Sequence, residues 1–406
     1  MRLLLYRLEL LLTGPLPSDV RRNMYVDVRG AIVVSAYFAI LNFIPIVLRR
    51  LGASVQELAY YYAVSALGML TAGIGMWLMR RYGLRRVALV SWLAGRSALL
   101  LTALASSVTG LLGIFSFFWV LESWASPGYV QTVQHIYPAR QRARVLAMTR
   151  LWLVGGILVV TPLAGWILDR WGYRALLPLA GLSALGSTFI FMPLLRGVPE
   201  MPVRTSPAAS SPWHMVRADR RFAVFLASTL LFGLSIAISN PIYPAIQVDR
   251  LNLSYTAVGL LGLVQSAFWF VSYLFLGRLV DHYGGIRCMV VVALINGLVM
   301  LPYIWAANGW MLIPSFVAAG LVAAGADLAG LTALIDIAGP ERTPDYAALN
   351  ATLTGLRGLA GPFVGSFLIQ LGWPLWTVLA LSTGLSVAGA AVMLLLARRS
   401  KERPGL

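Results

Sequence analysis

Apolar segments of about twenty residues follow one another along almost the whole chain, separated by short polar loops. A helix needs about 20 mostly apolar residues to cross a bilayer. Only 12% of the residues are charged and 59% are hydrophobic, whereas soluble domains carry about 25% charged residues. A soluble core could not bury so much apolar surface. We therefore expect an all-α membrane protein with twelve transmembrane helices, at roughly 29–48, 58–79, 87–107, 110–131, 147–168, 174–195, 222–247, 256–279, 288–307, 311–337, 348–370 and 374–397.

Basic residues alternate from one loop to the next. One set of loops carries Arg21, Arg22, Arg29, Arg80, Arg81, Arg85, Arg86, Arg140, Arg142, Arg144, Arg398, Arg399 and Lys401, and the other carries only Arg49, Arg50, Arg170, Arg174 and Arg250. The positive-inside rule places the first set, and with it both termini, in the cytoplasm of a cell whose inner or plasma membrane holds the protein. The net charge of +17 then indicates contact with membrane lipids. No basic face with interleaved aromatic residues indicates nucleic-acid binding.

A segment rich in proline and serine, 196–221, is predicted to be a cytoplasmic linker between two halves. Residues 29–195 and 222–397 would form two six-helix bundles, 1–28 an interfacial cytoplasmic segment and 398–406 a cytoplasmic tail. The halves match at a shift of about two hundred residues: Arg50, Leu51 and Ser54 with Arg250, Leu251 and Ser254; Tyr82, Gly83 and Arg86 with Tyr283, Gly284 and Arg287; Pro162, Gly165 and Gly172 with Pro362, Gly365 and Gly372. Parallel repeats of this kind are a transporter architecture with the substrate site at the midplane.

The loop after the eighth span has a distinctive spacing of glycine, acidic and basic residues. It contains Gly277, Arg278, Leu279, Asp281, Gly284 and Arg287. This spacing resembles the G-x-L-x-D-x-x-G-x-x-R loop of the major facilitator superfamily. The resemblance implies the twelve-helix fold of that family and a gating latch at this loop. The first half has a degenerate copy with Gly83, Arg85 and Arg86, in which Arg80 replaces the aspartate.

The fifth and eleventh spans each contain a proline followed by a glycine three residues later. They are Pro162 with Gly165, and Gly361 and Pro362 with Gly365. The fifth span partly resembles the G-x-x-x-G-P-x-x-G signature of drug/proton antiporters in the same superfamily, with Thr161 in place of a glycine. The alternative is a proline kink with small residues that allow tight helix packing.

Four ionisable residues stand out within the predicted spans, where such residues are costly and usually functional. Arg96 and Glu122 reach similar depths, so we expect them to pair, and Asp327 and Arg357 likewise. Either acid could carry a proton, with the nearby arginine lowering its pKa. Alternatively, each pair would hold neighbouring helices together. The resemblance favours this structural role for Arg96, because the third helix of the family is peripheral, whereas the fourth and tenth line its cavity.

Further polar and aromatic residues lie at helical spacing and could line a wet cavity. They are Asn42, Trp119, Gln265, Trp269, Asn240 and Tyr243. The first span, taken as 29–48, has no acidic residue, although many proton-coupled relatives have one there. Lone aromatic stripes also occur on lipid-facing and core surfaces.

Several other classes of function lack the residues they need. No G-x-x-x-x-G-K-[ST] phosphate cradle, nucleophile elbow or H-E-x-x-H motif occurs. Cys288 is the sole cysteine, and His135, His214 and His282 have no metal-ligand spacing. We therefore expect neither an enzyme nor a metal or other cofactor.

The sequence predicts a monomeric secondary transporter in which the two bundles rock around a central site. The leading hypothesis is proton-coupled export of a hydrophobic or amphipathic small molecule. One alternative is uptake or facilitated diffusion of a neutral or anionic metabolite, with Arg357 or Arg150 binding the anion. Movement of a lysolipid between leaflets is another.

Overall fold

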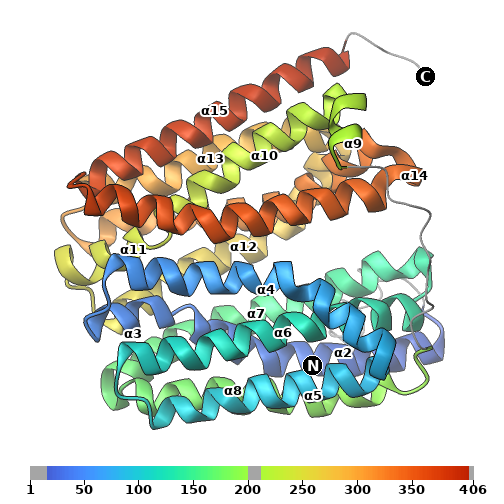
Figure 1. Cartoon of the computed structure of the whole chain (residues 1–406), viewed down its shortest axis with the longest axis horizontal. Coiled ribbons are helices and arrows are strands. Elements are labelled where there is room, and N and C mark those ends of the chain that lie inside the picture. The colour runs from blue at the N-terminus through green and yellow to red at the C-terminus, as the bar shows by residue number, and fades with distance from the viewer. Residues whose placement is uncertain (1–15, 200–211, 402–406) are drawn as a thin grey trace. The chain divides into compact units, whose positions relative to one another are not determined.

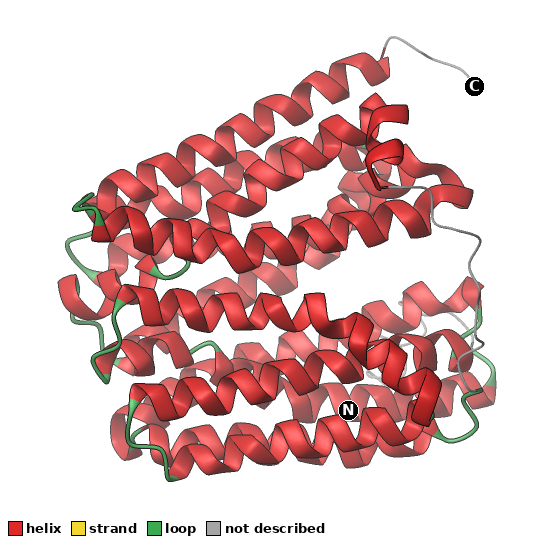
Figure 2. Ribbon diagram, viewed as in Figure 1, coloured by secondary structure: helices red, strands yellow, loops and turns green. Residues whose placement is uncertain are grey.

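The computed structural model describes residues 16–199 and 212–401, and throughout these residues the secondary structure is helical, without a strand (Figures 1 and 2). The chain forms two compact units. The first contains the described residues up to Ile44 together with those of 71–203, and the second contains Pro45–Leu70 and the described residues from 212 onward. Residues 1–15, most of the predicted linker and the end of the predicted tail lie outside the described residues. The assignment of the two bundles to separate domains stays a prediction.

The first unit consists of five long helices and one end of a sixth. They are α2 (Ser18–Leu41), α5 (Leu84–Ala98) with the 3₁₀ turn Leu99–Ala103, α6 (Val108–Ile136), α7 (Ala139–Trp171) and α8 (Tyr173–Phe191) with the 3₁₀ turn Met192–Leu195. Helix α4 (Val55–Tyr82) contributes residues to both units. Within the first unit α2 packs on α7 and α8, and α5 packs on α6 and α8.

The second unit is built mainly from the second half of the chain. Its helices are α3 (Ile44–Arg50), α9 (Pro212–Ala218), α10 (Arg220–Ser239), α11 (Ile242–Ala245) with the π turn Ile246–Arg250, α12 (Tyr255–Tyr283), α13 (Gly285–Trp305), the 3₁₀ turn Gly309–Leu312, α14 (Ile313–Gln370) and α15 (Leu375–Lys401). Helix α10 packs on α14 and α15, α13 packs on both of these, and α12 packs on α14.

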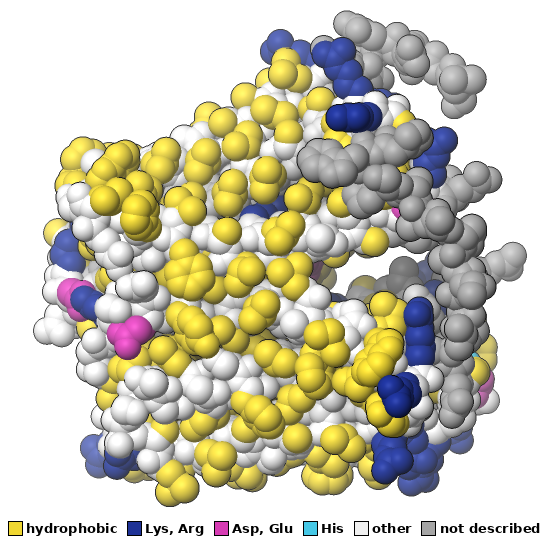
Figure 3. All heavy atoms as spheres, viewed as in Figure 1, with side chains coloured by type: hydrophobic (Ala, Val, Ile, Leu, Met, Phe, Trp, Pro, Cys, Tyr) yellow, Lys and Arg dark blue, Asp and Glu magenta, His cyan; other side chains and the backbone are white. Residues whose placement is uncertain are grey.

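Eleven helical stretches of the described chain are long and apolar enough to cross a membrane, from Ser18–Arg50 to Leu375–Arg398. The predicted span 348–370 lies in the remaining part of α14, beyond a kink at Gly339, whose φ is 67°. Hydrophobic side chains cover much of the face seen in Figure 3, and Lys and Arg lie mainly near helix ends. Lipid is the solvent such a surface requires. The predicted all-α, multi-span fold is confirmed.

The internal repeat is visible in the backbone. Gly83 and Gly284 have φ of 89° and 82° and precede α5 and α13, and Gly172 and Gly372 have φ of 74° and 87°. Positive φ favours glycine, so these turns need that residue. Both halves also use a serine side chain at the matching helix start, because Ser54 accepts from Glu57 N at 3.2 Å and Ser254 from Ala257 N at 3.1 Å.

Candidate functional site

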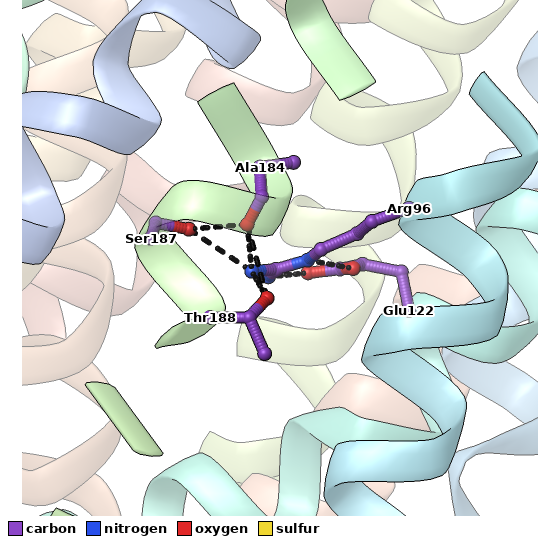
Figure 4. A network of polar contacts seen from close by, with 5 residues as sticks. All are labelled: Arg96, Glu122, Ala184, Ser187 and Thr188. Carbon is purple, nitrogen blue, oxygen red and sulfur yellow. Dashed lines mark hydrogen bonds and ion pairs between the residues drawn. The ribbon is translucent and has the colours of Figure 1, made fainter. Parts of the chain in front are cut away.

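The interior of the first unit contains a buried arginine whose donors are all directed at neighbouring helices (Figure 4). Arg96 Nε and Nη2 donate to the Glu122 carboxylate on α6 at 3.0 and 2.6 Å. Its Nη1 donates to Ala184 O, Ser187 Oγ and Thr188 Oγ1 on α8 at 2.9, 3.0 and 2.7 Å. The Arg96 side chain is 8% exposed and that of Glu122 is 21% exposed. The predicted pairing of these two residues is therefore formed, and it is bidentate.

Close contact between α5 and α6 brings this pair together. A Cβ at Gly95 would lie 3.0 Å from Cβ of Leu121, so a larger residue would push the two helices apart. The indole nitrogen of Trp119, one turn before Glu122, is buried without a hydrogen-bond partner among the described residues. Buried donors normally have a partner, so this indole remains a candidate for contact with substrate.

A second carboxyl group in the first unit was missed from the sequence. Asp27 on α2 is 4% exposed, and it accepts from Tyr137 Oη at 3.3 Å and Thr149 Oγ1 at 3.5 Å. It forms no ion pair with any described residue. The expectation that the first span lacks an acidic residue is wrong, because that span begins at Ser18 instead of 29.

The reason for the error lies in the arginines at the start of α2. Arg21, Arg22 and Arg29 suggested a loop, although they lie on the helix. The buried residues Val20, Met24, Asp27, Val28 and Ala31 recur at helical spacing. That spacing was the signal in the sequence that the helix starts before 29.

In the second unit the polar side chains of the eighth span meet the tenth. Tyr273 Oη on α12 donates to Asp327 Oδ2 on α14 at 2.7 Å. The rings of Trp269 and Tyr273 are 6.4 Å apart, and Trp269 Nε1 is buried without a partner among the described residues. Gly320 permits this crossing, because a Cβ there would overlap the carbonyl oxygen of Gln265. Three predicted site residues, Gln265, Trp269 and Asp327, thus lie along the contact between α12 and α14.

Arg357 lies elsewhere in the second unit and has a different environment. Its Nη1 donates to the carbonyl oxygen of Thr229 on α10, and its guanidinium occupies the space next to Gly233, where a Cβ would overlap Nε and Cζ. Within the described chain it forms no ion pair. The predicted pairing of Asp327 with Arg357 is therefore wrong for this structure, because depth along the membrane does not specify which face of a helix each residue occupies.

The remaining predicted lining residues lie near helix ends. Asn42 follows α2 and is exposed, and Asn240 follows α10. Tyr243 Oη donates to Ser239 Oγ at 3.0 Å, and its ring lies 4.5 Å from that of Tyr303. None of them forms a hydrogen bond with the carboxyl groups described above, so their role stays a prediction.

The predicted gating loop joins α12 to α13. Gly284 has the positive φ that ends one helix and starts the next. Arg278, Asp281 and Arg287 are exposed, as is Arg86 in the matching loop. Gly277 has open space around it. The loop geometry fits a tight turn between the two helices, and its place in the cytoplasm and its action as a latch stay predictions.

The proline and glycine residues of the fifth and eleventh spans have structural contacts. Pro162 lies inside α7, and Gly165 is buried there. Gly361 and Gly365, which flank Pro362, face α10, where a Cβ would overlap Ala237 Cβ and the carbonyl oxygen of Ile238. Helix packing accounts for the glycines of the eleventh span without a coupling role.

Solved structures with a similar fold are transporters. The chain superposes on the crystal structure of the nucleoside transporter NupG (D323A mutant) with a TM-score of 0.70 and 12% identity, covering 93% of this chain and 100% of that one. It superposes on a bacterial homologue of the human lysosomal transporter Spinster, inward-facing and unoccupied, with a TM-score of 0.66 and 12% identity, covering 96% and 100%. Identities this low establish the fold alone.

No curated protein sequence matches the chain. The family model of the Major Facilitator Superfamily matches residues 30–236 and again 225–406, which agrees with the repeat in the sequence and the backbone. Together these matches span nearly the whole chain. The protein is a multi-pass membrane transporter of small molecules, not an enzyme, and it belongs to the Major Facilitator Superfamily.

Proposed function

We propose that the protein is a proton-coupled secondary transporter that exports a hydrophobic or amphipathic small molecule. The observation that carries proton coupling is the buried carboxyl group of Asp27, which lies in a membrane span and has only hydroxyl partners. A carboxylate removed from water costs free energy unless it is paired or protonated. Intramembrane carboxyl groups of this kind are the usual proton carriers of transporters.

The partners of Asp27 suit both protonation states. A hydroxyl group donates to a carboxylate and can also accept from a protonated carboxylic acid, whereas an arginine can only donate. Tyr137 and Thr149 can therefore remain hydrogen-bonded to Asp27 before and after proton release. Arg150, which follows Thr149, has an exposed side chain and forms no ion pair with Asp27 within the described chain.

The two acids singled out from the sequence fit this role unequally. Glu122 is held by two hydrogen bonds from Arg96, and protonation of Glu122 would leave the buried guanidinium without its counter-ion. Asp327 is exposed and bonded to the hydroxyl of Tyr273. We propose Asp27 as the first proton carrier and Asp327 as a second candidate.

The remaining features of the proposal rest on the indoles and on the sequence. The orphaned indoles of Trp119 and Trp269 favour an aromatic or apolar solute with an acceptor group. The basic loops favour the inner or plasma membrane, with both termini cytoplasmic and contact with anionic lipids, and we take the transporter to be a monomer. Uptake or facilitated diffusion, and lysolipid movement, are the competing functions.

The test is transport in proteoliposomes with an imposed pH gradient. A thermal-shift screen of lipophilic cations, sugars, organic acids and lysolipids first selects a compound that stabilises the protein. We expect the wild type to move that compound against proton flow and Asp27→Asn to lose gradient-driven transport. Asp19→Asn is the matched control, because Asp19 is exposed on the same helix.

Each alternative gives a different result. If Asp27→Asn keeps full gradient-driven transport, Asp27 does not carry the proton. Transport that ignores the pH gradient in the wild type indicates facilitated diffusion. Accumulation that follows proton entry indicates uptake by symport.

A further inference from the structure

We infer that Arg357 binds the anionic group of an amphipathic substrate within the second unit. This inference rests on the proposed function only in taking the cargo to be an amphipathic solute. It adds the charge of that solute and the residue that recognises it. The candidate anionic groups are carboxylate, phosphate and sulfonate, each of which presents at least two acceptor oxygens to the paired N–H donors of a guanidinium.

The position of the guanidinium is the first argument. It lies against Gly233, which is near the middle of the membrane-crossing stretch Arg220–Arg250. At about 1.5 Å per residue, either end of that stretch is roughly 20 Å away. Arg357 therefore does not reach the headgroup region as terminal arginines do. Its charge lies at the depth where transporters of this architecture hold their substrates.

The local packing is the second argument. Because Gly233 has no Cβ, Nε and Cζ of Arg357 can occupy the space next to it, and any side chain there would displace them. One donor nitrogen bonds the carbonyl oxygen of Thr229. A guanidinium has five N–H donors, and the described chain supplies no further hydrogen bond to this one. The glycine positions the group against α10 while leaving its other donors free.

The lack of a counter-ion is the third argument. The carboxylate expected to pair with Arg357 is Asp327, and its bond is to Tyr273 instead. Polar groups of the neighbouring helices are also occupied, because Asn296 on α13 donates to Ser235 on α10 and Ser386 on α15. A charged residue inside a membrane span is normally paired. An incoming anion would supply the missing charge.

Arg96 shows how this chain satisfies an arginine that ties helices together within the protein. All its nitrogens have partners, and a carboxylate neutralises it. Arg357 has neither feature. The contrast within one chain separates a helix tie from a ligand-binding group.

The test measures anion binding to the full-length protein in nanodiscs of neutral phosphatidylcholine at one pH, without a gradient. Decanoate, dodecyl phosphate and dodecyl sulfonate are compared with decanol and dodecyltrimethylammonium. Inorganic phosphate serves as the anion without an alkyl chain. Ligand-induced shifts in the unfolding temperature give apparent affinities. The variants are Arg357→Gln, which keeps a donor for Thr229, and Gly233→Ala, which displaces the guanidinium but keeps its charge. Arg398→Gln removes an exposed arginine at the end of α15 as the matched control.

We expect at least one anion with an alkyl chain to bind the wild type. Its affinity for Arg357→Gln and Gly233→Ala should be lower by a factor of about ten or more. Arg398→Gln should bind as the wild type does. Because binding is measured at one pH without a gradient, failure of the proposed proton coupling would leave this result unchanged. Stabilisation by inorganic phosphate alone would show a site for free anions and overturn the amphipathic substrate. Equal binding by wild type and both variants, or no binding by any anion, would overturn the site.

Discussion

Arg96 on α5 and Asn296 on α13 are buried polar residues on corresponding helices of the two halves. Each joins its helix to the last long helix of its own unit. Arg96 donates to Ser187 Oγ at 3.0 Å, and Asn296 donates to Ser386 Oγ at 2.8 Å. In both units, therefore, a buried polar connection joins corresponding helices.

The two connections differ in charge. Asn296 is satisfied by two serine hydroxyls, so its connection contains no charged group. Neutral hydrogen bonds are thus sufficient to hold the corresponding helices of the second unit together. The ion pair in the first unit exceeds what packing requires, so we expect the Glu122 carboxylate, fixed by Arg96, to take part in transport.

The largest expected effect comes from removing half of that ion pair. Arg96→Asn leaves Glu122 as an uncompensated charge, and breaking a buried pair costs about 3–5 kcal/mol. The double variant Arg96→Asn, Glu122→Val makes the connection neutral, like the one in the second unit, and should recover most of that stability. Thermal unfolding of the purified variants measures the difference.

Transport by the double variant then decides what the charges do. If the stable double variant also transports at the wild-type rate, the pair is structural and the comparison teaches only packing. We expect instead that its transport is lost while its stability returns.

A smaller effect is expected where glycines let helices cross. A Cβ at Gly75 would overlap the backbone of Trp124, and one at Gly320 would overlap that of Gln265. Alanine at either position should destabilise the protein by about 1–3 kcal/mol through overpacking. Gly73→Ala and Gly384→Ala are matched controls with open space around them. A crossing variant as stable as its control would show that its unit tolerates a wider helix separation.

Loss of the neutral connection should cost less again. Asn296→Ala removes two interhelical hydrogen bonds, and such bonds in membranes are worth about 0.6 kcal/mol on average and at most about 1.7. Ser386→Ala should be similar, and the two changes together should be less than additive because they share a bond. Denaturant unfolding of the three variants measures this. A loss as large as that of Arg96→Asn would remove the distinction between the two connections.

The smallest effect on stability is expected at the matching loops. Asp281 and Arg80 are exposed, so replacing either with Asn should change the free energy of unfolding by less than about 0.5 kcal/mol. If the latch depends on the aspartate, Asp281→Asn slows transport severalfold and Arg80→Asn does not. Initial transport rates in proteoliposomes test this asymmetry. Equal rates for both variants and the wild type would mean that neither loop acts as a latch.

Much of the fold was predictable because a bilayer imposes simple requirements. The length of each apolar segment, the alternation of basic loops and the repeated glycine turns depend on local sequence, and the helices follow them. The pairing of Arg96 with Glu122 was also predictable, since both residues are at the same depth on consecutive helices. The start of α2 was predicted wrongly, because Arg21, Arg22 and Arg29 suggested a loop although they lie on the helix.

By itself, the sequence determined that this chain is a helical membrane protein with two related halves, since hydrophobicity and period are properties of neighbouring residues. Tertiary structure alone decided which polar groups meet. The rotation of each helix about its axis placed Asp327 against Tyr273, left Arg357 beside Gly233 without a counter-ion, and enclosed Asp27 between two hydroxyl groups. Depth along the membrane can be counted from the sequence, whereas the face that each residue presents is set by packing among helices distant in the chain.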